Sequence, residues 1–158
     1  MTLSTFCNRV VLGGISLHTR TPLHHVRGNL NALRYRDEIL RPLVVPQLQQ
    51  IGNNAILQDD NARPHRGNIV NTFIHQNQIN RLPWPANSPD LNPIKHLWDE
   101  LGRRVKKNYP RAGDLNQLVQ NLQQEWNAIP QEFPPKLGRS MCNRYRECLD
   151  NNGGHTRY

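Results

Sequence analysis

Residues 55–58 (AILQ) form a short apolar run that ends in Asp59, Asp60 and Asn61, and Pro64 follows shortly afterwards. A run of this length that is bounded by turn residues predicts a buried β-strand, and proline suits the first turn of a helix. Ligands of open α/β sheets bind at the carboxyl ends of the strands. A strand that delivers carboxylates to a helix start therefore predicts an α/β fold, and it constrains the chain more than any other stretch.

The rest of the chain fits this fold class. We expect strands at residues 9–16, 21–26, 55–58 and 79–84, and helices at residues 30–40, 64–74, 92–105, 114–126 and 135–150. The first two strands should form a hairpin. Asn29, Asn92 and Asp114 are the expected helix caps, while Pro42 and Pro46 leave the end of the first helix open. The early alternation of strands and helices indicates an α/β sheet, and the later helices would cover one face.

The composition favours a polyanionic partner. The 158 residues carry a formal net charge of +8, with a pI of about 10.0, which is typical of proteins that bind nucleic acid. The alternative is a solvated basic surface. The cluster of Arg103, Arg104, Lys106 and Lys107 has the same two interpretations, because it can contact DNA phosphates or close a helix end favourably for the helix dipole.

Other classes are disfavoured. The three cysteines, Cys7, Cys142 and Cys148, lack metal-binding spacing, and reduced thiols in an intracellular protein are the default interpretation. No apolar stretch approaches the roughly 18–20 residues that span a bilayer. We therefore expect no membrane partner, and no feature indicates a small-molecule substrate.

Two long segments carry a resemblance to a known family. LQDDNARPH (residues 57–65) and SPDLNPIKHLW (residues 88–98), with RYRDEILRPLVVP, EWNAIPQEF and the terminal GGHTRY, closely resemble the catalytic domain of mariner-type cut-and-paste transposases of the Tc/mariner superfamily. The likeness extends from about Arg9 to Tyr158. It implies a ribonuclease-H-like fold in which two aspartates and a third acid hold two Mg²⁺ or Mn²⁺ ions that cut and rejoin DNA.

The resemblance also implies that this catalytic set is incomplete. Asp60 matches the second family acid, and Lys95 occupies the position of the third, with 34 residues between them as in one large branch of the family. A charged ammonium has no lone pair for a metal. The first family acid lies on a strand upstream of residues 9–16, and MTLSTFCN (residues 1–8) contains no Asp or Glu. Asp60 is the expected metal ligand, and binding of Mg²⁺ or Mn²⁺ is in doubt.

The same comparison predicts the domain organisation. Residues 1–8 would be an atypical stub, residues 9–150 a partial DDE catalytic domain lacking its first central strand, and residues 151–158 a polar tail. Loss of the central strand would leave backbone groups unpaired, at a cost of about 1–3 kcal/mol each. We therefore expect either a marginally stable chain or a sheet in which residues 1–8 partly fill the gap.

Neighbouring side chains receive more ordinary roles. Asp59 should be a solvated neighbour of Asp60, and a salt bridge between Lys95 and Asp60 is a hypothesis. His65 and His96 should pack or hydrogen bond at helix starts. Trp84 and Trp98 should lie in the core. Asp99 and Glu100 are not expected to replace the third acid, because Asp99 is placed for a local pair with Lys95.

The sequence thus predicts a degenerate DDE transposase domain that is inactive in cleavage. Three alternatives stay open: a basic module that binds DNA without cutting it, a module that binds a full-length transposase, and a gene-model fragment without function. DNA is the expected partner. The expected location is the nucleus in a eukaryote, and otherwise the cell interior.

Overall fold

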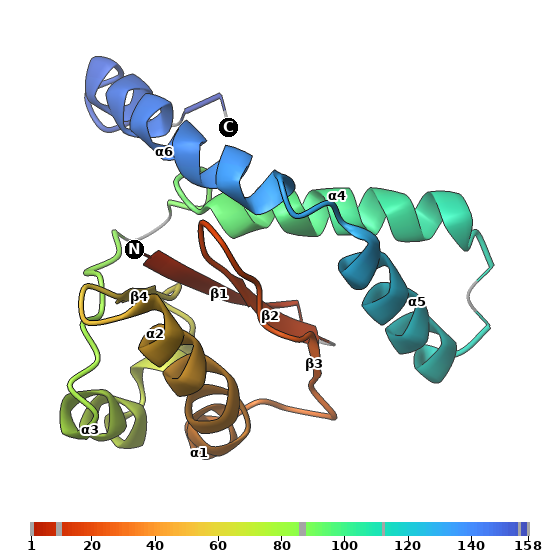
Figure 1. The fold of residues 1–158 in the computed structure, drawn as a ribbon, viewed down its shortest axis with the longest axis horizontal. Coiled ribbons are helices and arrows are strands. Elements are labelled where there is room, and N and C mark those ends of the chain that lie inside the picture. Colours follow the sequence, from red (N-terminus) through yellow and green to blue (C-terminus); the bar gives the residue numbers. More distant parts are fainter. Residues whose placement is uncertain (1, 9–10, 86–87, 112, 155, 158) are drawn as a thin grey trace. The chain divides into compact units, whose positions relative to one another are not determined.

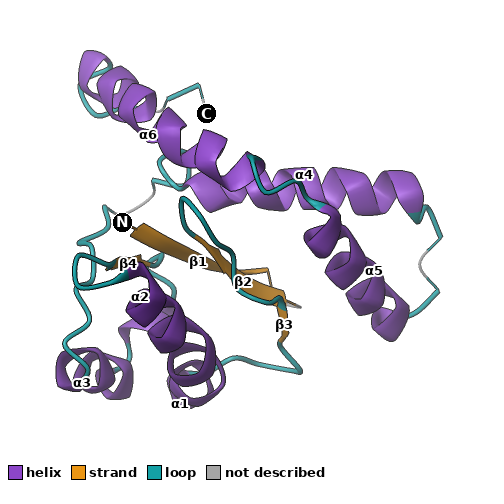
Figure 2. Ribbon diagram, viewed as in Figure 1, coloured by secondary structure: helices purple, strands orange, loops and turns teal. Residues whose placement is uncertain are grey.

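The computed structural model describes residues 2–8, 11–85, 88–111, 113–154 and 156–157, with side chains from residue 11 onward. The chain divides into two compact units, Met1–Asn87 and Ser88–Tyr158, here called unit 1 and unit 2, and each is described by itself. Unit 1 contains the sheet and the first group of helices, whereas unit 2 has only helices among its regular elements in the described residues (Figures 1 and 2).

A four-stranded mixed sheet organises unit 1. Its strands are β1 (Thr2–Asn8), β2 (Val11–Ile15), β3 (His24–His25) and β4 (Ile56–Gln58), in the order β3-β2-β1-β4. β1 is antiparallel to β2 and parallel to β4. An isolated bridge between Ile15 and Arg20 extends the pairing of the β2–β3 segment, so the predicted hairpin is confirmed.

The predicted absence of the first central strand is wrong, because β1 occupies that position. The backbone register pairs Ser4 with Ile15 of β2 and with Gln58 of β4. Residues 1–8 were expected at most to fill the gap in part, yet seven of them form a strand that is paired on both sides. Pairing satisfies the backbone N–H and C=O groups of both neighbours. The sequence of the strand, TLSTFCN, still provides no carboxylate.

The helical segment after the hairpin starts later and ends later than the sequence predicts. Its cap is Asn31 rather than Asn29, and the Asn31 side chain accepts a hydrogen bond from Arg34 N–H at 2.9 Å. The segment comprises α1 (Ala32–Arg34), the π-helix η1 (Tyr35–Val44) and α2 (Val45–Ile51). Pro42 lies inside η1. Proline lacks an N–H donor, and the wider π-helical winding lets the segment continue to Gly52.

The segment after β4 also differs in one element. The short 3₁₀-helix η2 (Arg63–Arg66) and helix α3 (Asn68–Gln76) replace the single helix expected from Pro64. The expected strand at residues 79–84 is wrong, since only one parallel bridge, between Leu57 and Arg81, joins it to β4. Prolines that follow at 83 and 85 cannot donate to a sheet.

One hydrophobic core holds unit 1 together. It joins side chains from the sheet to both helical groups: Leu12, Val26, Tyr35, Ile39, Leu40, Val44, Leu48, Leu57, Val70, Phe73 and Ile74. β4 thus has a buried apolar side chain, Leu57, immediately before the polar residues that follow it. This anchoring fixes where the strand ends, and with it the start of the candidate site.

Unit 2 consists of α4 (Pro93–Asn108), α5 (Leu115–Ala128) and α6 (Phe133–Asp150), and α4 packs against the other two. Asp114 caps α5 as predicted, accepting from Gln117 N–H at 2.8 Å. Trp98 is buried and stacks on Trp126 with ring centroids 5.4 Å apart, so its predicted core role is confirmed. Among the described residues, every helix is too short or too polar to cross a membrane.

Candidate active site at the end of strand β4

Two consecutive aspartates follow β4 and have opposite surroundings. The Asp59 side chain is fully buried, whereas Asp60 keeps 24% of its side chain exposed. The prediction that Asp59 is a solvated neighbour is therefore wrong. Successive side chains of an extended chain point to opposite sides, so the residue beside an accessible Asp60 is turned into the unit.

Asp59 lies between two arginines. Its Oδ1 is 3.0 Å from Arg66 Nη2, and its Oδ2 is 4.0 Å from Arg81 Nη1. Among the described residues, neither oxygen receives a hydrogen bond of good geometry, so the contacts are ionic. Burial raises the pKa of Asp59, and the nearby His65, Arg66 and Arg81 oppose that rise. A buried carboxylate between cations satisfies the rule that buried charges are paired.

The same arginines join the elements around the strand end. Arg66 donates from Nε and Nη2 to Asn61 Oδ1 at 3.0 and 2.7 Å. Arg81 donates from Nη1 to the His65 carbonyl at 3.2 Å and from Nη2 to Asn71 Oδ1 at 2.9 Å. Sequence reasoning missed this network, since the partners lie up to about twenty residues apart along the chain.

Asp60, predicted to be the second family acid, also has local partners. Its Oδ1 accepts from Ala62 N–H at 3.0 Å and lies 2.8 Å from His65 Nδ1. His65 is buried, and its ring stacks on Tyr35 with centroids 4.1 Å apart. The predicted packing role of His65 is therefore confirmed. Trp84, expected in the core, is only half-buried, and its carbonyl accepts from Asn61 Nδ2 at 3.2 Å.

These residues do not fit a pair of divalent metal ions. Mg²⁺ and Mn²⁺ require several oxygen ligands. Asp59 is turned toward guanidinium groups that would repel a cation, and Asp60 already pairs with His65. In the described portions of the chain, no group of three or more His, Cys, Asp or Glu side chains is arranged to hold a metal.

Lys95, at the third family position, lies in the first turn of α4 in unit 2. Asn92 precedes the helix and Pro93 is its first residue, as predicted, but the Asn92 side chain makes no capping hydrogen bond. The hypothesis of a salt bridge between Lys95 and Asp60 stays a prediction, because the two residues belong to different units. Glu100 pairs with Arg103 and Arg104, which makes it unsuitable as a replacement acid.

The C-terminal residues contact the loop that precedes α4. Thr156 N–H donates to Asp90 Oδ2 at 2.8 Å, and Arg144 Nη1, which is buried, donates to the Asp90 carbonyl at 2.5 Å. Burial raises the pKa of Asp90, but hydrogen bonds with Thr156 and with the backbone of Asp90 and Leu91 together outweigh this effect and lower the pKa on balance. Burial and the nearby Arg144 lower the pKa of His96. Thr156, expected in a polar tail, thus belongs structurally to unit 2.

The two arginines of the predicted nucleic-acid-binding cluster are paired with an acid, whereas its two lysines are exposed. Arg104 Nε donates to Glu100 Oε1 at 2.7 Å, and Arg103 pairs with the same carboxylate. Lys106 and Lys107 are exposed in the last turn of α4. These two lysines are the members of the cluster best placed to attract a phosphate, and their role in DNA binding stays a prediction.

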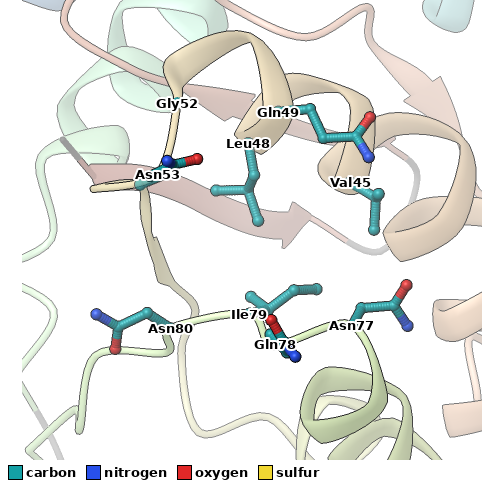
Figure 3. Close-up of a pocket in the computed structure, with 10 residues that line it drawn as sticks. Val45, Leu48, Gln49, Gly52, Asn53, Asn77, Gln78, Ile79 and Asn80 are labelled. Atoms are coloured by element: carbon teal, nitrogen blue, oxygen red, sulfur yellow. The ribbon is translucent and has the colours of Figure 1, made fainter.

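A pocket of about 450 Å³ lies at the opposite, amino-terminal end of β4, between α2 and residues 77–80 (Figure 3). Leu48 and Ile79 face each other across it, and several carboxamide side chains surround them. No charged side chain lines this pocket among the described residues. It therefore offers no charged group for a phosphate or a metal, whereas Asp59, Asp60 and the arginines near them lie at the other end of the strand.

Comparison with known proteins gives a consistent result. Residues 6–119 match the family model described as DDE superfamily endonuclease. The transposase of the transposable element Tcb1 from Caenorhabditis briggsae is 34% identical over 150 residues, covering 94% of this chain and 54% of the relative. The chain therefore spans about half the length of this curated relative.

Solved structures show the same fold. The Mos1 transposase catalytic domain with raltegravir and Mg aligns with a TM-score of 0.85 at 18% identity, covering 99% of this chain and 85% of that chain. A Mos1 transposase paired-end complex with the left transposon end aligns with a TM-score of 0.74 at 21% identity, covering 92% of this chain and 44% of that chain. The predicted ribonuclease-H-like fold is thus confirmed.

Proposed function

Because this chain belongs to the DDE superfamily endonuclease family, we propose that it is a transposase-derived domain that binds DNA and does not cut it. The observation that carries this proposal is the state of the acids at the end of β4. Asp59 is buried against arginines and Asp60 pairs with His65. With no carboxylate in β1 and Lys95 at the third position, the residues present do not supply a two-metal site.

DNA is the proposed partner for two reasons. Unit 1 carries nine Lys and Arg residues against four Asp and Glu, and unit 2 carries eleven against eight, so both units are basic. In addition, a structural neighbour, the Mos1 transposase, forms a paired-end complex with a transposon end. A basic protein that neutralises phosphates releases counterions from DNA, which makes its binding strongly dependent on salt.

The test separates binding from cleavage. Purified chain is incubated with transposon-end DNA, with Mn²⁺ for cleavage and without metal for binding. We expect retention of DNA that weakens steeply between 50 and 200 mM salt, as for proteins that contact several phosphates, and no strand cleavage. Metal-dependent cleavage would overturn the proposed inactivity, and absence of salt-dependent retention would overturn the proposed binding.

The exposed lysines of α4 provide a more local test. Changing Lys106 and Lys107 to Gln should weaken retention on all DNA sequences to a similar degree, because phosphate contacts carry no sequence information. Each phosphate contact that is lost should reduce the salt slope by about 1. An unchanged slope would assign these lysines to the solvated helix end that the sequence also allows.

A full-length transposase is the second proposed partner. Its support is the coverage of the relatives, since the chain aligns with about half of the Tcb1 transposase, and the occurrence of a paired-end assembly in the Mos1 protein. Co-purification with an intact family member tests it. If the chain comes from a eukaryote, the nucleus is the location where either partner would be met.

A further inference from the structure

Arg66 and Arg81 lie at the carboxyl end of β4, where both are near Asp59, and Arg63 lies in the same short helix as Arg66. Arg63 and Arg66 are three residues apart in η2, and Arg81 lies on the segment bridged to β4. Side chains at i and i+3 of a 3₁₀-helix eclipse one another, so Arg63 and Arg66 project from the same side of this short element. The sequence-based search for basic clusters did not identify them, because they are not consecutive.

The arginines differ in how many of their donors are used. Arg81 is occupied by the His65 carbonyl and Asn71. Arg66 uses Nε and Nη2 on Asn61, with Asp59 beside Nη2. Within the described residues, Arg66 Nη1 donates no hydrogen bond, and the Arg63 guanidinium makes neither an ion pair nor a hydrogen bond. Cationic donors are therefore available on one fixed and one exposed guanidinium.

We propose that Arg63 and Arg66 bind a backbone phosphate of DNA beside Asp60, and that Asp59 is the positioning residue that holds Arg66 for this contact. The inference rests on the proposed DNA binding and locates it at the family site. Arginine suits this role because its planar fork matches the geometry of phosphate oxygens.

Asp59 has the properties of an orienting group. It is fully buried, so it cannot meet a DNA strand or a solvated metal itself, yet its carboxylate touches the guanidinium of Arg66. Asn61 Oδ1 accepts from Nε and Nη2 of the same guanidinium, so Asn61 and Asp59 both hold the part of it that carries Nη2. An arginine that is held in place before binding loses less conformational entropy when a phosphate arrives. A buried anion can thus favour the binding of another anion.

If Asp59 orients Arg66, replacing Asp59 should change the affinity for DNA in the direction opposite to the one that its charge alone predicts. Asp59→Asn removes a negative charge, which alone should strengthen the attraction to DNA. If Asp59 orients Arg66, the substitution should instead weaken binding, by about 3- to 10-fold. Asp37→Asn is the matched control, because Asp37 lies in η1 and its removal changes the net charge equally. Binding at least as tight as that of wild type is expected for the control.

The arginines are tested in the same assay, in which full-length chain binds a labelled DNA duplex without metal at several salt concentrations. Arg63→Gln with Arg66→Gln should reduce the salt slope by about 2, since each phosphate contact contributes about 1. Arg66→Lys retains the charge without the fork and should also weaken binding. Arg139→Gln with Arg146→Gln, two exposed residues on α6, is the charge-matched control because it also removes two positive charges.

The outcomes separate the two proposals. If the wild-type chain binds DNA but the double variant of Arg63 and Arg66 behaves like the double variant of Arg139 and Arg146, the phosphate site is wrong and the DNA-binding function stands. If Asp59→Asn binds as tightly as Asp37→Asn, the orienting role of Asp59 is wrong. If the wild-type chain fails to bind DNA, both proposals fail. If Asp59→Asn does not fold, two single variants still test the site: Arg63→Gln changes an exposed side chain, and Arg66→Lys keeps the positive charge beside Asp59.

Discussion

At the scale of single residues, two neighbouring carboxylates at the end of β4 differ in burial and in partners because they point to opposite sides of an extended chain. Asp59 is enclosed with two guanidiniums, whereas Asp60 is accessible and pairs with His65. A buried carboxylate can be stabilised only by fixed partners. An exposed one can exchange them. Asp60, the predicted family acid, is therefore on the accessible side, and its buried neighbour Asp59 belongs to the arginine network.

The pKa values of Asp59 and Asp90 are shifted in opposite directions, which predicts how each residue's contribution to stability depends on pH. Burial raises the pKa of Asp59 above its unfolded value, so the stability from this group is present below the unfolded pKa, about 3.9, and is lost as pH rises through the folded pKa. Hydrogen bonds with Thr156 and with the backbone of Asp90 and Leu91 together lower the pKa of Asp90 despite burial, so its contribution is present at higher pH and is lost as pH falls.

Urea unfolding between about pH 2 and pH 7 checks these signs, because the contribution of Asp90 changes mainly below its unfolded pKa. The free energy of unfolding of wild type minus that of Asp59→Asn should decrease with rising pH, by about 1.4 kcal/mol for each unit by which the pKa is raised. The corresponding difference for Asp90→Asn should increase. A difference for Asp59 that grows with pH would show that the arginines dominate over burial.

A second residue-scale prediction concerns Lys95. Lys95→Glu should restore a carboxylate at the third family position but no cleavage of transposon-end DNA in Mn²⁺. The reason is that β1 contains no acid and Asp59 faces arginines, so two metal ions still lack ligands. Gel analysis of the incubated DNA checks this expectation. Product formation by this single variant would contradict the proposed loss of the metal site.

Residue roles were predictable from sequence where they depend on local spacing. The Asp114 cap, the helix start at Pro93 and the packing of Trp98 follow from neighbours within about one or two turns. The burial of Asp59 was not predictable, because its partners Arg66 and Arg81 are placed by tertiary structure. Arg144 and Thr156, which hold Asp90, were missed for the same reason.

At the scale of elements, β1 is the part of the sheet with the most backbone pairing. Its register matches five residues of β2 and three of β4. The sequence predicted β2, β4 and the three helices of unit 2, all of which have clear patterns. It did not predict β1, because TLSTFCN lacks strict alternation and the resemblance seen in the sequence was traced only from about Arg9. Pairing with β2 and β4, rather than a pattern in its own sequence, makes residues 2–8 a strand.

Proline at the centre of β1 tests its role. Ser4→Pro removes an N–H from the residue that is paired with both Ile15 and Gln58. We expect the free energy of unfolding to fall by at least about 1–3 kcal/mol, the cost of one unpaired buried backbone group. Thermal unfolding followed by circular dichroism measures the change. Ser4→Ala keeps the N–H and should unfold close to wild type, and equal stability of both variants would argue against a central β1.

The end of α3 offers a stabilising substitution. Gln78 has a φ of 52°, in the left-handed region, and follows the last turn of the helix. Glycine is favoured there because it has no Cβ to strain. The left-handed conformation costs a residue with a Cβ about 1–2 kcal/mol, and glycine gives back about 0.4–1 kcal/mol through the entropy of the unfolded chain. Gln78→Gly should therefore raise the free energy of unfolding by about 0.5–1 kcal/mol. Asn152→Gly, at the same φ of 52°, is the control: asparagine tolerates this region better, so its gain should be smaller.

At the scale of the whole molecule, both units carry excess positive charge, which favours association with a polyanion throughout the chain. This balance was evident from composition. The division at Asn87 and Ser88 was not, because the family-like motif pair runs continuously across it. Composition indicates the class of partner. Which residues contact the partner depends on the structure, because some cations, such as Arg103 with Glu100, are already paired within the chain.

Binding should be visible as stabilisation of the folded chain. A ligand at 100 times its Kd stabilises the folded state by about 2.7 kcal/mol, and about 1 kcal/mol shifts the Tm by about 2–4 °C in a chain of this size. Duplex DNA should therefore raise the Tm by about 5–11 °C at low salt. The shift should disappear in high salt, and a salt-independent shift would contradict electrostatic binding.

The parallel pairing of β1 with β4 has a consequence for how the protein is made. Ser4 and Gln58 are partners although 54 positions separate them. At a synthesis rate of about 5–20 residues per second, β1 leaves the ribosome roughly 3–11 seconds before β4 exists. During that interval the β2–β3 hairpin is its sheet partner, and the other edge is open to unrelated chains. The strand that completes the sheet is thus also its most vulnerable part during synthesis, when early protection by a chaperone would matter most.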